Sequence, residues 1–324
     1  MRAERRLRST LQAVALGALG CCPPAPVPAS PPAPAQASAS PEGWPRAVVR
    51  RENQRIEFGP YALEVDPTDG GRIIAFSLDG RSVVVPKEES PEAYGSSFWP
   101  SPQSDWRWPP PLAWDRRAWK VSVEDRSLVL ESDQDPKLGL SARQRFTADL
   151  AHGAVAIEFT ITNRGPAPRR VAPWQNTRVR PRGLTFYPSS APTLPESSLK
   201  LEPARGIIWF SHDPAVFKQS KKSYSDAEEG WVAQVDGALL FVKVFSDVPH
   251  DQIAPNEGEV VLYVHEGGLF VEVEQQGPYV ELAPGAASTW PLRWLVRKLP
   301  PGMAARPGND QLVEFVRALV AGVR

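Results

Sequence analysis

The stretch Ala154–Asn163, AVAIEFTITN, decides the fold class because its apolar and polar residues alternate. Val155, Ile157, Phe159 and Ile161 occupy one parity, and alanine, glutamate and threonine residues fill the positions between them. Side chains on a strand point alternately to opposite faces, so a period of two indicates a half-buried β-strand. A helix would need apolar residues three and four positions apart. This stretch therefore predicts β-structure.

The same alternation recurs between Trp44 and Leu299, most clearly in Trp290–Arg297. Asp79-Gly80 and Asp236-Gly237 supply residues that tolerate positive φ and predict hairpin turns. The chain is also expected to turn at Asp125-Arg126. No parallel βαβ unit or glycine-rich phosphate loop is present. Residues 44–300 therefore predict one large antiparallel β-sandwich. The other expected strands are Tyr61–Val65, Arg72–Leu78, Ser82–Val85, Val121–Val123, Leu128–Leu130, Leu140–Phe146, Gly206–Phe210, Trp231–Val235, Ala238–Phe245, Glu259–Val264 and Leu269–Glu274.

Helical spacing is found only at the end of the chain, in residues 301–324. Leu312, Val316, Leu319 and Val323 recur at the spacing of one helix face, and Asn309 or Asp310 precedes them as an N-cap. We expect one amphipathic helix that packs its apolar stripe on the sandwich.

The first residues have the pattern of an export signal. Basic residues precede a short apolar run within residues 1–20, which is too short to span a membrane and predicts a signal peptide. The run ends in Ala18–Cys21, which resembles a bacterial lipobox whose cysteine is acylated. Residues 21–43 are rich in Pro, Ala and Ser and predict an extended tether. We expect an exported protein anchored to the cell envelope through Cys21; ordinary secretion is the alternative.

Composition narrows the classes of partner. Both cysteines, Cys21 and Cys22, directly follow the predicted signal peptide, so the body is predicted to use neither disulfides nor cysteine-held metal. The 37 basic and 37 acidic residues balance, which argues against nucleic acid as a partner. No histidine pair has metal-ligand spacing, so we expect no metal and no cofactor.

A tryptophan- and proline-rich segment, Ser96–Pro111 (SSFWPSPQSDWRWPPP), is predicted to be a loop. Proline lacks a donor N–H and has a fixed φ, which excludes a central strand or a helix interior. Trp99, Trp106 and Trp108 supply flat apolar faces, and Gln103 lies between them. Such a combination suits a sugar, which offers a C–H face and a rim of hydroxyls. The other interpretation is that the indoles plug one end of the sandwich.

Glu272 and Glu274 lie two residues apart on an expected strand, which places both carboxylates on one face. Two such groups can divide acid and base roles if their environments separate their pKa values. A polar face in water is the alternative interpretation. Of the 4 histidines, His265 alone lies near these groups in the sequence.

Several segments resemble the galactose mutarotase-like superfamily, and the resemblance covers about Ile56 to Leu299. Within the superfamily, the chain is most similar to bacterial proteins of unassigned function, the DUF4380-type proteins. The segments that carry the resemblance are Asp69–Ile74, Trp99–Pro110, Ile161–Arg164, Trp174–Asn176, Gly230–Val232, Phe241–Lys243, Glu272–Glu274 and Leu282–Gly285.

This resemblance implies a β-supersandwich whose concave face binds carbohydrate. It also implies that Glu274, or else Glu272, corresponds to the base of aldose 1-epimerases. The histidine acid of those enzymes has no counterpart in Ala172–Arg178. An arginine cannot replace it, because its pKa is too high to release a proton. The candidate carbohydrate-binding residues are Arg72, Trp99, Gln103, Trp106, Trp108, Trp174, Gln175, Asn176 and Arg178.

We therefore expect an all-β, mutarotase-like supersandwich with one C-terminal helix that binds carbohydrate and lacks mutarotase chemistry. One alternative is an epimerase-like enzyme that uses a glutamate base. Another is a structural envelope protein without a ligand.

Overall fold

The computed structural model describes residues 48–50, 54–189, 198–212 and 217–324. The predicted signal peptide, Cys21 and the tether lie outside the described residues. Within them, every strand pairing is antiparallel, as predicted.

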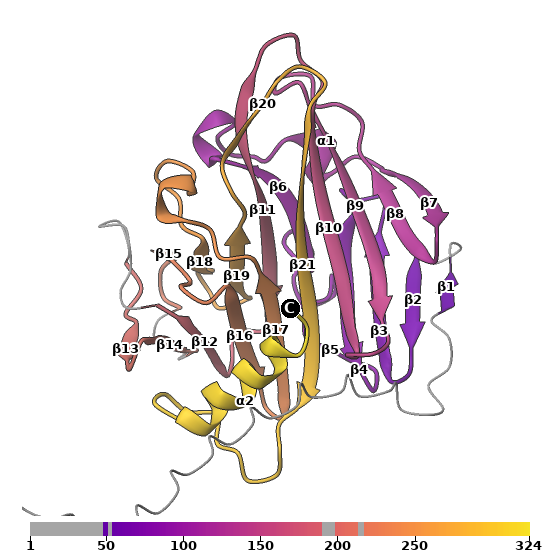
Figure 1. Ribbon diagram of the computed structural model, residues 1–324. Coiled ribbons are helices and arrows are strands. Elements are labelled where there is room, and N and C mark those ends of the chain that lie inside the picture. The colour runs from indigo at the N-terminus through magenta and orange to yellow at the C-terminus, as the bar shows by residue number, and fades with distance from the viewer. Residues whose placement is uncertain (1–47, 51–53, 190–197, 213–216) are drawn as a thin grey trace, which may run out of the picture. The chain divides into compact units, whose positions relative to one another are not determined.

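The strands form two sheets that lie in two layers (Figure 1). Sheet A has 11 strands. Its main order is β1 (Val48–Arg50), β2 (Arg55–Phe58), β3 (Tyr61–Asp66), β4 (Arg72–Leu78), β6 (Ser96–Ser101), β11 (Arg169–Val179), β19 (Val271–Gln276), β18 (Val260–Val264) and β15 (Lys221–Ser225). β5 (Arg81–Ser82) pairs with β4, and β20 (Val280–Leu282) pairs with β11.

Sheet B has 10 strands. Their order is β13 (Glu202–Ala204), β14 (Ile207–Ser211), β12 (Leu184–Pro188), β16 (Trp231–Asp236), β17 (Leu239–Phe245), β21 (Ala287–Lys298), β10 (Ala154–Asn163), β9 (Leu140–Asp149), β8 (Ser127–Glu131) and β7 (Lys120–Glu124).

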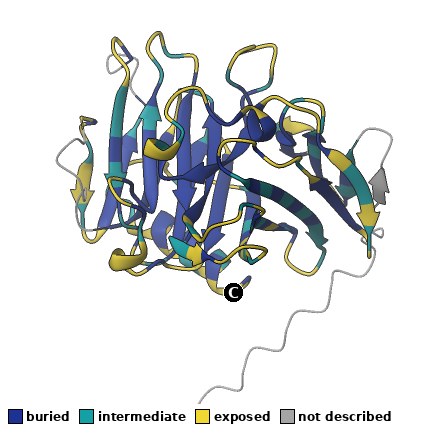
Figure 2. Ribbon diagram, turned by 90° about the horizontal axis from the view of Figure 1, so that it is seen from above, coloured by how far each residue is buried: buried dark blue, intermediate teal, exposed yellow. Residues whose placement is uncertain are grey.

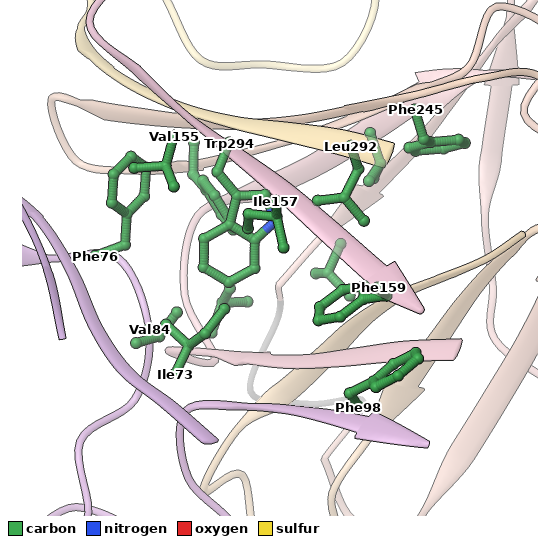
Figure 3. Close-up of a cluster of buried hydrophobic side chains, with 14 of the residues drawn as sticks. Ile73, Phe76, Val84, Phe98, Val155, Ile157, Phe159, Phe245, Leu292 and Trp294 are labelled. Atoms are coloured by element: carbon green, nitrogen blue, oxygen red, sulfur yellow. The ribbon is translucent and has the colours of Figure 1, made fainter. Parts of the chain in front are cut away.

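The core lies where the inner faces of the two sheets meet (Figure 3). Phe98 of β6 stacks on Phe159 of β10 with ring centroids 4.2 Å apart, and Phe76 of β4 lies 5.8 Å from Trp294 of β21. Burying each such side chain stabilises the fold by roughly 1.5–3 kcal/mol. Figure 2 shows exposed residues mainly in the connecting loops, while the central strands are buried.

The prediction that Ser96–Pro111 is wholly a loop is wrong, because its first part forms β6 between β4 and β11. Pro100 lies opposite Pro173 of β11. Neither proline can donate, so the two form a non-hydrogen-bonded pair whose nitrogens point away from each other. The Pro100 nitrogen faces the side on which β4 pairs with β6 only at Ser96, so no ladder bond is lost.

The expectation of helix only at the end is also wrong, because short helical segments interrupt the strands. They are η1 (Gln103–Asp105), α1 (Leu112–Asp115) and η3 (His250–Gln252). Pro111 immediately precedes α1 and its carbonyl accepts from Asp115 N at 3.0 Å. Proline is acceptable there because the first N–H groups of a helix have no intrahelical partner.

The predicted C-terminal helix is α2 (Asp310–Ala321), and Asn309 caps it by accepting from Gln311 N at 3.1 Å. Leu312, Val316 and Val320 are buried against the face of sheet B that points away from sheet A. The hairpin turns at Asp79-Gly80 and Asp125-Arg126 form as predicted, with positive φ at all four residues. Among the described residues, no helix has the length and apolar character needed to cross a bilayer.

Candidate functional site

A cavity of about 700 Å³ opens on the face of sheet A that points away from sheet B. That orientation follows from β11, whose Gln175 and Thr177 contact Trp294 and Lys243 of sheet B. The alternate residues of β11 must point the other way. Nine of the predicted site residues line this cavity: Arg72, Trp99, Gln103, Trp108, Trp174, Asn176, Arg178, Glu272 and Glu274.

The β6–β11 pairing brings predicted site residues from two distant segments together, because Trp99 lies directly opposite Trp174. Their rings meet edge to face with centroids 5.3 Å apart. Both indoles are almost fully buried, and their N–H groups donate to carboxylates of Asp115 (2.8 Å) and Glu274 (2.6 Å). These two rings form the floor of the site.

Trp108 differs from the other indoles because 72% of its surface is exposed. It meets Trp99 edge to face at 6.3 Å. Trp106 is half-buried, packs against Trp99 and Trp174, and does not line the cavity. Trp99 and Trp106 therefore fold inward, as the plug interpretation expects, whereas Trp108 remains exposed at the cavity.

Gln175 is the second predicted site residue that the structure places outside the cavity. It is fully buried between the sheets, where its Oε1 accepts from Gln275 Nε2 at 2.5 Å and from Trp294 Nε1 at 3.1 Å. Its position one residue from Trp174 and from Asn176 puts it on the opposite face of β11.

A row of polar side chains crosses four strands of sheet A. The strand registers align Arg178 with Glu272, Glu272 with Tyr263, and Tyr263 with Lys222. Arg178 Nε donates to Glu272 Oε1 at 3.0 Å, and its Nη1 donates to Ser97 Oγ at 2.8 Å. Glu272 is therefore held as the partner of a buried guanidinium.

Glu274 has a different environment from Glu272. It is 1% exposed, its Oε2 accepts from Trp174, and its Oε1 has no partner among the described residues. Burial raises the pKa of Glu274 to about 8; the Lys222 ammonium opposes this shift and Glu272 adds to it. One of the two carboxylates is thus ion-paired and the other is inclined to hold a proton.

Asn176 lies across from Glu274 by the register of β11 with β19. It is 1% exposed, and neither its Oδ1 nor its Nδ2 has a partner among the described residues. An unpaired buried polar group costs about 1–3 kcal/mol, so its presence needs an explanation. A hydroxyl-bearing ligand in the cavity would satisfy both atoms.

Arg72 is positioned by α1. Its Nη1 donates to Tyr94 O at 3.1 Å and its Nη2 to Asp115 Oδ1 at 3.2 Å. Gly70, at φ +73°, allows this approach, because a Cβ there would lie 2.5 Å from the carbonyl oxygens of Trp114 and Asp115. Gly70 thus lets the end of α1 approach closely enough for the Asp115 carboxylate to reach the Arg72 guanidinium.

Lys222, Tyr263 and Asp115 also line the cavity, although no pattern in the sequence indicates them as site residues. Lys222 Nζ lies 5.2 Å from the Trp174 ring centroid. Burial by itself would lower the pKa of Lys222, but Glu274 and the other acidic groups nearby raise it above its ordinary value. His265, singled out in the sequence, also lines the cavity. Glu274 makes no hydrogen bond to it, since Glu274 Oε2 is bonded to Trp174 and Oε1 is unpaired.

Asp226, Asp247 and Glu259 lie close enough together to hold a metal ion, but they do not line the cavity. Both carboxylate oxygens of Glu259 already accept backbone N–H groups, from Ala227 at 2.9 Å and Val248 at 2.7 Å. Burial raises the pKa of Glu259 to about 8. This cluster is better described as a loop anchor than as a metal site.

The chain belongs to the DUF4380 family, described as a domain of unknown function, whose family model matches residues 52–297. No curated protein matches the chain.

The fold of this chain is shared by solved structures of galactose mutarotase-like proteins. A protein from Escherichia coli K12 named as a candidate aldose 1-epimerase is 15% identical, with a TM-score of 0.51; the match covers 74% of this chain and 97% of that one. A galactose mutarotase-like protein from Clostridium acetobutylicum is 10% identical, with a TM-score of 0.52 over 76% of this chain and 95% of that one. Another from Lactobacillus casei is 12% identical, with a TM-score of 0.52 over 75% and 99%. The expected mutarotase-like supersandwich is therefore confirmed.

Proposed function

We propose that the cavity binds a carbohydrate and that the protein acts as a sugar-binding module. The unpaired amide of Asn176 carries the proposal, because both of its polar atoms are buried at the cavity and have no partner among the described residues. A sugar hydroxyl can donate and accept at once, so adjacent hydroxyls match an amide. The names of the structural neighbours support the same class of ligand.

Trp108 supplies the apolar half of this recognition. Its exposed indole offers a flat face to the C–H side of a sugar ring, while the polar groups deeper in the cavity face the hydroxyls. The three arginines of the cavity are paired with carboxylates: Arg72 with Asp115, Arg178 with Glu272, and Arg116 with Asp69 and Asp115. This balance favours a neutral or weakly acidic sugar.

The proposal is tested with the purified full chain on a glycan array, followed by calorimetric titration of the glycans retained. Trp108→Ala is expected to weaken binding by about 1–3 kcal/mol without changing the melting temperature, because the removed ring is mostly exposed. Val123→Ala removes another exposed apolar side chain, outside the cavity, and serves as the matched control. Equal affinities for Trp108→Ala and the parent protein would contradict the proposed site.

Epimerase-like catalysis is the second candidate, and the raised pKa of Glu274 with its unpaired oxygen favours it. Ring opening needs one proton delivered to the ring oxygen while another leaves the anomeric hydroxyl. Glu274 makes no hydrogen bond to a histidine, so we propose that mutarotase chemistry is absent. NMR measurement of anomer interconversion decides: a rate that depends on Glu274 would replace the binding proposal by an enzyme.

We also propose that an acyl group on Cys21 holds the protein at the cell envelope. The support is the sequence alone, in which a short apolar run ends at this cysteine. Cys21→Ser is expected to remove incorporation of a fatty-acid analogue and release the protein from the membrane fraction. Cys22→Ser is the control, and label that persists in Cys21→Ser but not in Cys22→Ser would move the anchor to Cys22.

A further inference from the structure

We propose that the ligand is a glycan chain rather than a single sugar, and that it crosses Trp108 from the cavity into a neighbouring hollow. This inference rests on the proposed carbohydrate-binding function. The hollow has a volume of about 440 Å³ and shares Trp108 and Pro109 with the cavity. Its far side is formed by the segment before β9, including Lys137 and Leu138.

The apolar surface at this junction is unusual for the protein. Four large hydrophobic residues are exposed among the described residues, and two of them, Trp108 (72%) and Leu112 (53%), line the hollow. Exposed apolar side chains that gather around a concavity are typical of a binding surface. Trp108 lies between the two concavities, so one face of a continuous chain could rest on it.

Several hydrogen bonds hold the backbone segment that precedes Trp108, residues 103–107. Trp106 Nε1 donates to Pro100 O at 2.8 Å, Gln103 N donates to Glu257 Oε1 at 2.9 Å, and Arg107 N donates to Gln103 O at 2.8 Å. Arg107 itself has φ +58°, a conformation that a non-glycine residue keeps only where its surroundings hold it. An exposed ring on a fixed support loses little entropy when it binds.

The hollow also offers free hydrogen-bond donors. The side chains of Arg107, Arg117 and Lys137 line it and make no hydrogen bond or ion pair with the rest of the described chain. The Asp135 carboxylate, by contrast, already accepts from Lys137 N at 2.9 Å and Leu138 N at 2.8 Å. Hydroxyl groups of a second sugar unit can accept from the free cations.

The volumes of the cavity and the hollow also favour a glycan chain over a single sugar. The cavity alone, at about 700 Å³, is within the range of roughly 300–1,000 Å³ that encloses drug-sized ligands. A monosaccharide has far fewer atoms than such ligands and would leave much of the cavity, and all of the hollow, to water. A chain of several units fills both.

The test uses the full chain and ladders of β-1,4-galactan, cello-, xylo- and galacturonate oligosaccharides, from the monosaccharide to the hexasaccharide. In the ladder that binds, we expect affinity to rise about tenfold between the monosaccharide and the tetrasaccharide, because the added units contact Leu112 and the free cations of the hollow. Leu112→Ala and Lys137→Ala, which change only the hollow, are expected to remove this gain and leave monosaccharide binding unchanged. Trp108→Ala should weaken binding of every length, and Val123→Ala of none.

The outcomes separate the two proposals. Affinity that is constant along the ladder, or hollow variants that weaken monosaccharide and tetrasaccharide equally, would overturn the chain proposal and leave the sugar site intact. Absence of binding by every member of every ladder would overturn the carbohydrate site itself, and the chain proposal with it.

Discussion

Glu272 and Glu274 show how neighbours on other strands give two similar residues different roles. Both carboxylates reach the cavity, as their spacing on a strand predicts. Glu272 is paired with the buried guanidinium of Arg178, whereas burial raises the pKa of Glu274 although Trp174 donates a hydrogen bond to it. These partners lie on β11, about a hundred positions earlier in the chain, so the sequence does not reveal the difference.

The raised pKa of Glu274 makes the stability of the protein depend on pH. This pKa rises from 4.5 in the unfolded chain to about 8 in the folded protein, so the folded state binds more protons between these values. The contribution of Glu274 to stability is therefore greatest below pH 4.5 and is lost as the pH rises to about 8. Glu274→Gln stays neutral, and its free energy of unfolding should fall less than that of the parent protein over this range.

Urea unfolding at several pH values measures this slope, and Glu259→Gln is the matched control. Glu259 is also buried with a pKa of about 8, but it lies outside the cavity. Glu259→Gln should flatten the slope while keeping glycan binding, although one backbone N–H loses its acceptor. Glu274→Gln should reduce binding as well. Parallel pH curves for Glu274→Gln and the parent protein would show that this carboxyl is ionised in the fold.

Gln175 and Asn176 show what could have been predicted at this scale. Strand alternation alone separates them, and applying it to β11 would have kept Trp174, Asn176 and Arg178 and excluded Gln175. Lys222 could not have been found in this way. It reaches the cavity because β15 pairs with β18, and no pattern in the sequence indicates that pairing.

At the scale of the element, α1 connects the tryptophan-rich segment to β4. Its Asp115 accepts from both Arg72 and Trp99 Nε1 and so joins two walls of the cavity. This contact depends on Gly70, which lies against the carbonyl groups at the end of α1.

Gly70→Ala is therefore expected to displace α1, lower the free energy of unfolding by more than the roughly 1–2 kcal/mol of left-handed backbone strain, and weaken glycan binding. Gly80→Ala is the control, because Gly80 has φ +76° but open space around its Cβ position. Gly80→Ala should lower the free energy of unfolding by the backbone strain alone and leave glycan binding unchanged. Calorimetric melting and titration of both variants measure the difference. Equal losses of stability and of glycan affinity in Gly70→Ala and Gly80→Ala would show that the position of α1 does not matter for the site.

The elements that were missed share a physical cause. β6 contains Pro100, which argues against a central strand, and the sequence does not show that this proline faces an unpaired side. β12 and β15 are short and lack strict alternation, so long-range pairing rather than local pattern makes them strands. The long strands β9, β10 and β21 and the helix α2 have strong periodicity, and the sequence predicts them well.

At the scale of the molecule, Lys243 joins the two sheets behind the cavity. It extends from β17 of sheet B into the core, where its Nζ donates to Thr177 Oγ1 and Val273 O of sheet A, both at 2.8 Å. These acceptors lie on β11 and β19, the two strands whose other faces carry Asn176 and Glu274. Burial lowers the pKa of Lys243 well below its ordinary value.

This lowered pKa predicts how stability changes above neutral pH. The unfolded chain holds a proton on Lys243 up to its ordinary pKa of 10.5, and the folded protein releases it earlier. The unfolded state thus binds more protons in this window, so the contribution of Lys243 makes stability rise with pH, by at most about 1.4 kcal/mol per pH unit. Lys243→Met keeps a long side chain but cannot titrate, so it should lack this rise. Urea unfolding of both proteins between neutral pH and pH 10.5 measures the difference. Because all other groups are common to the two, curves that stay parallel would mean that Lys243 keeps its charge in the core.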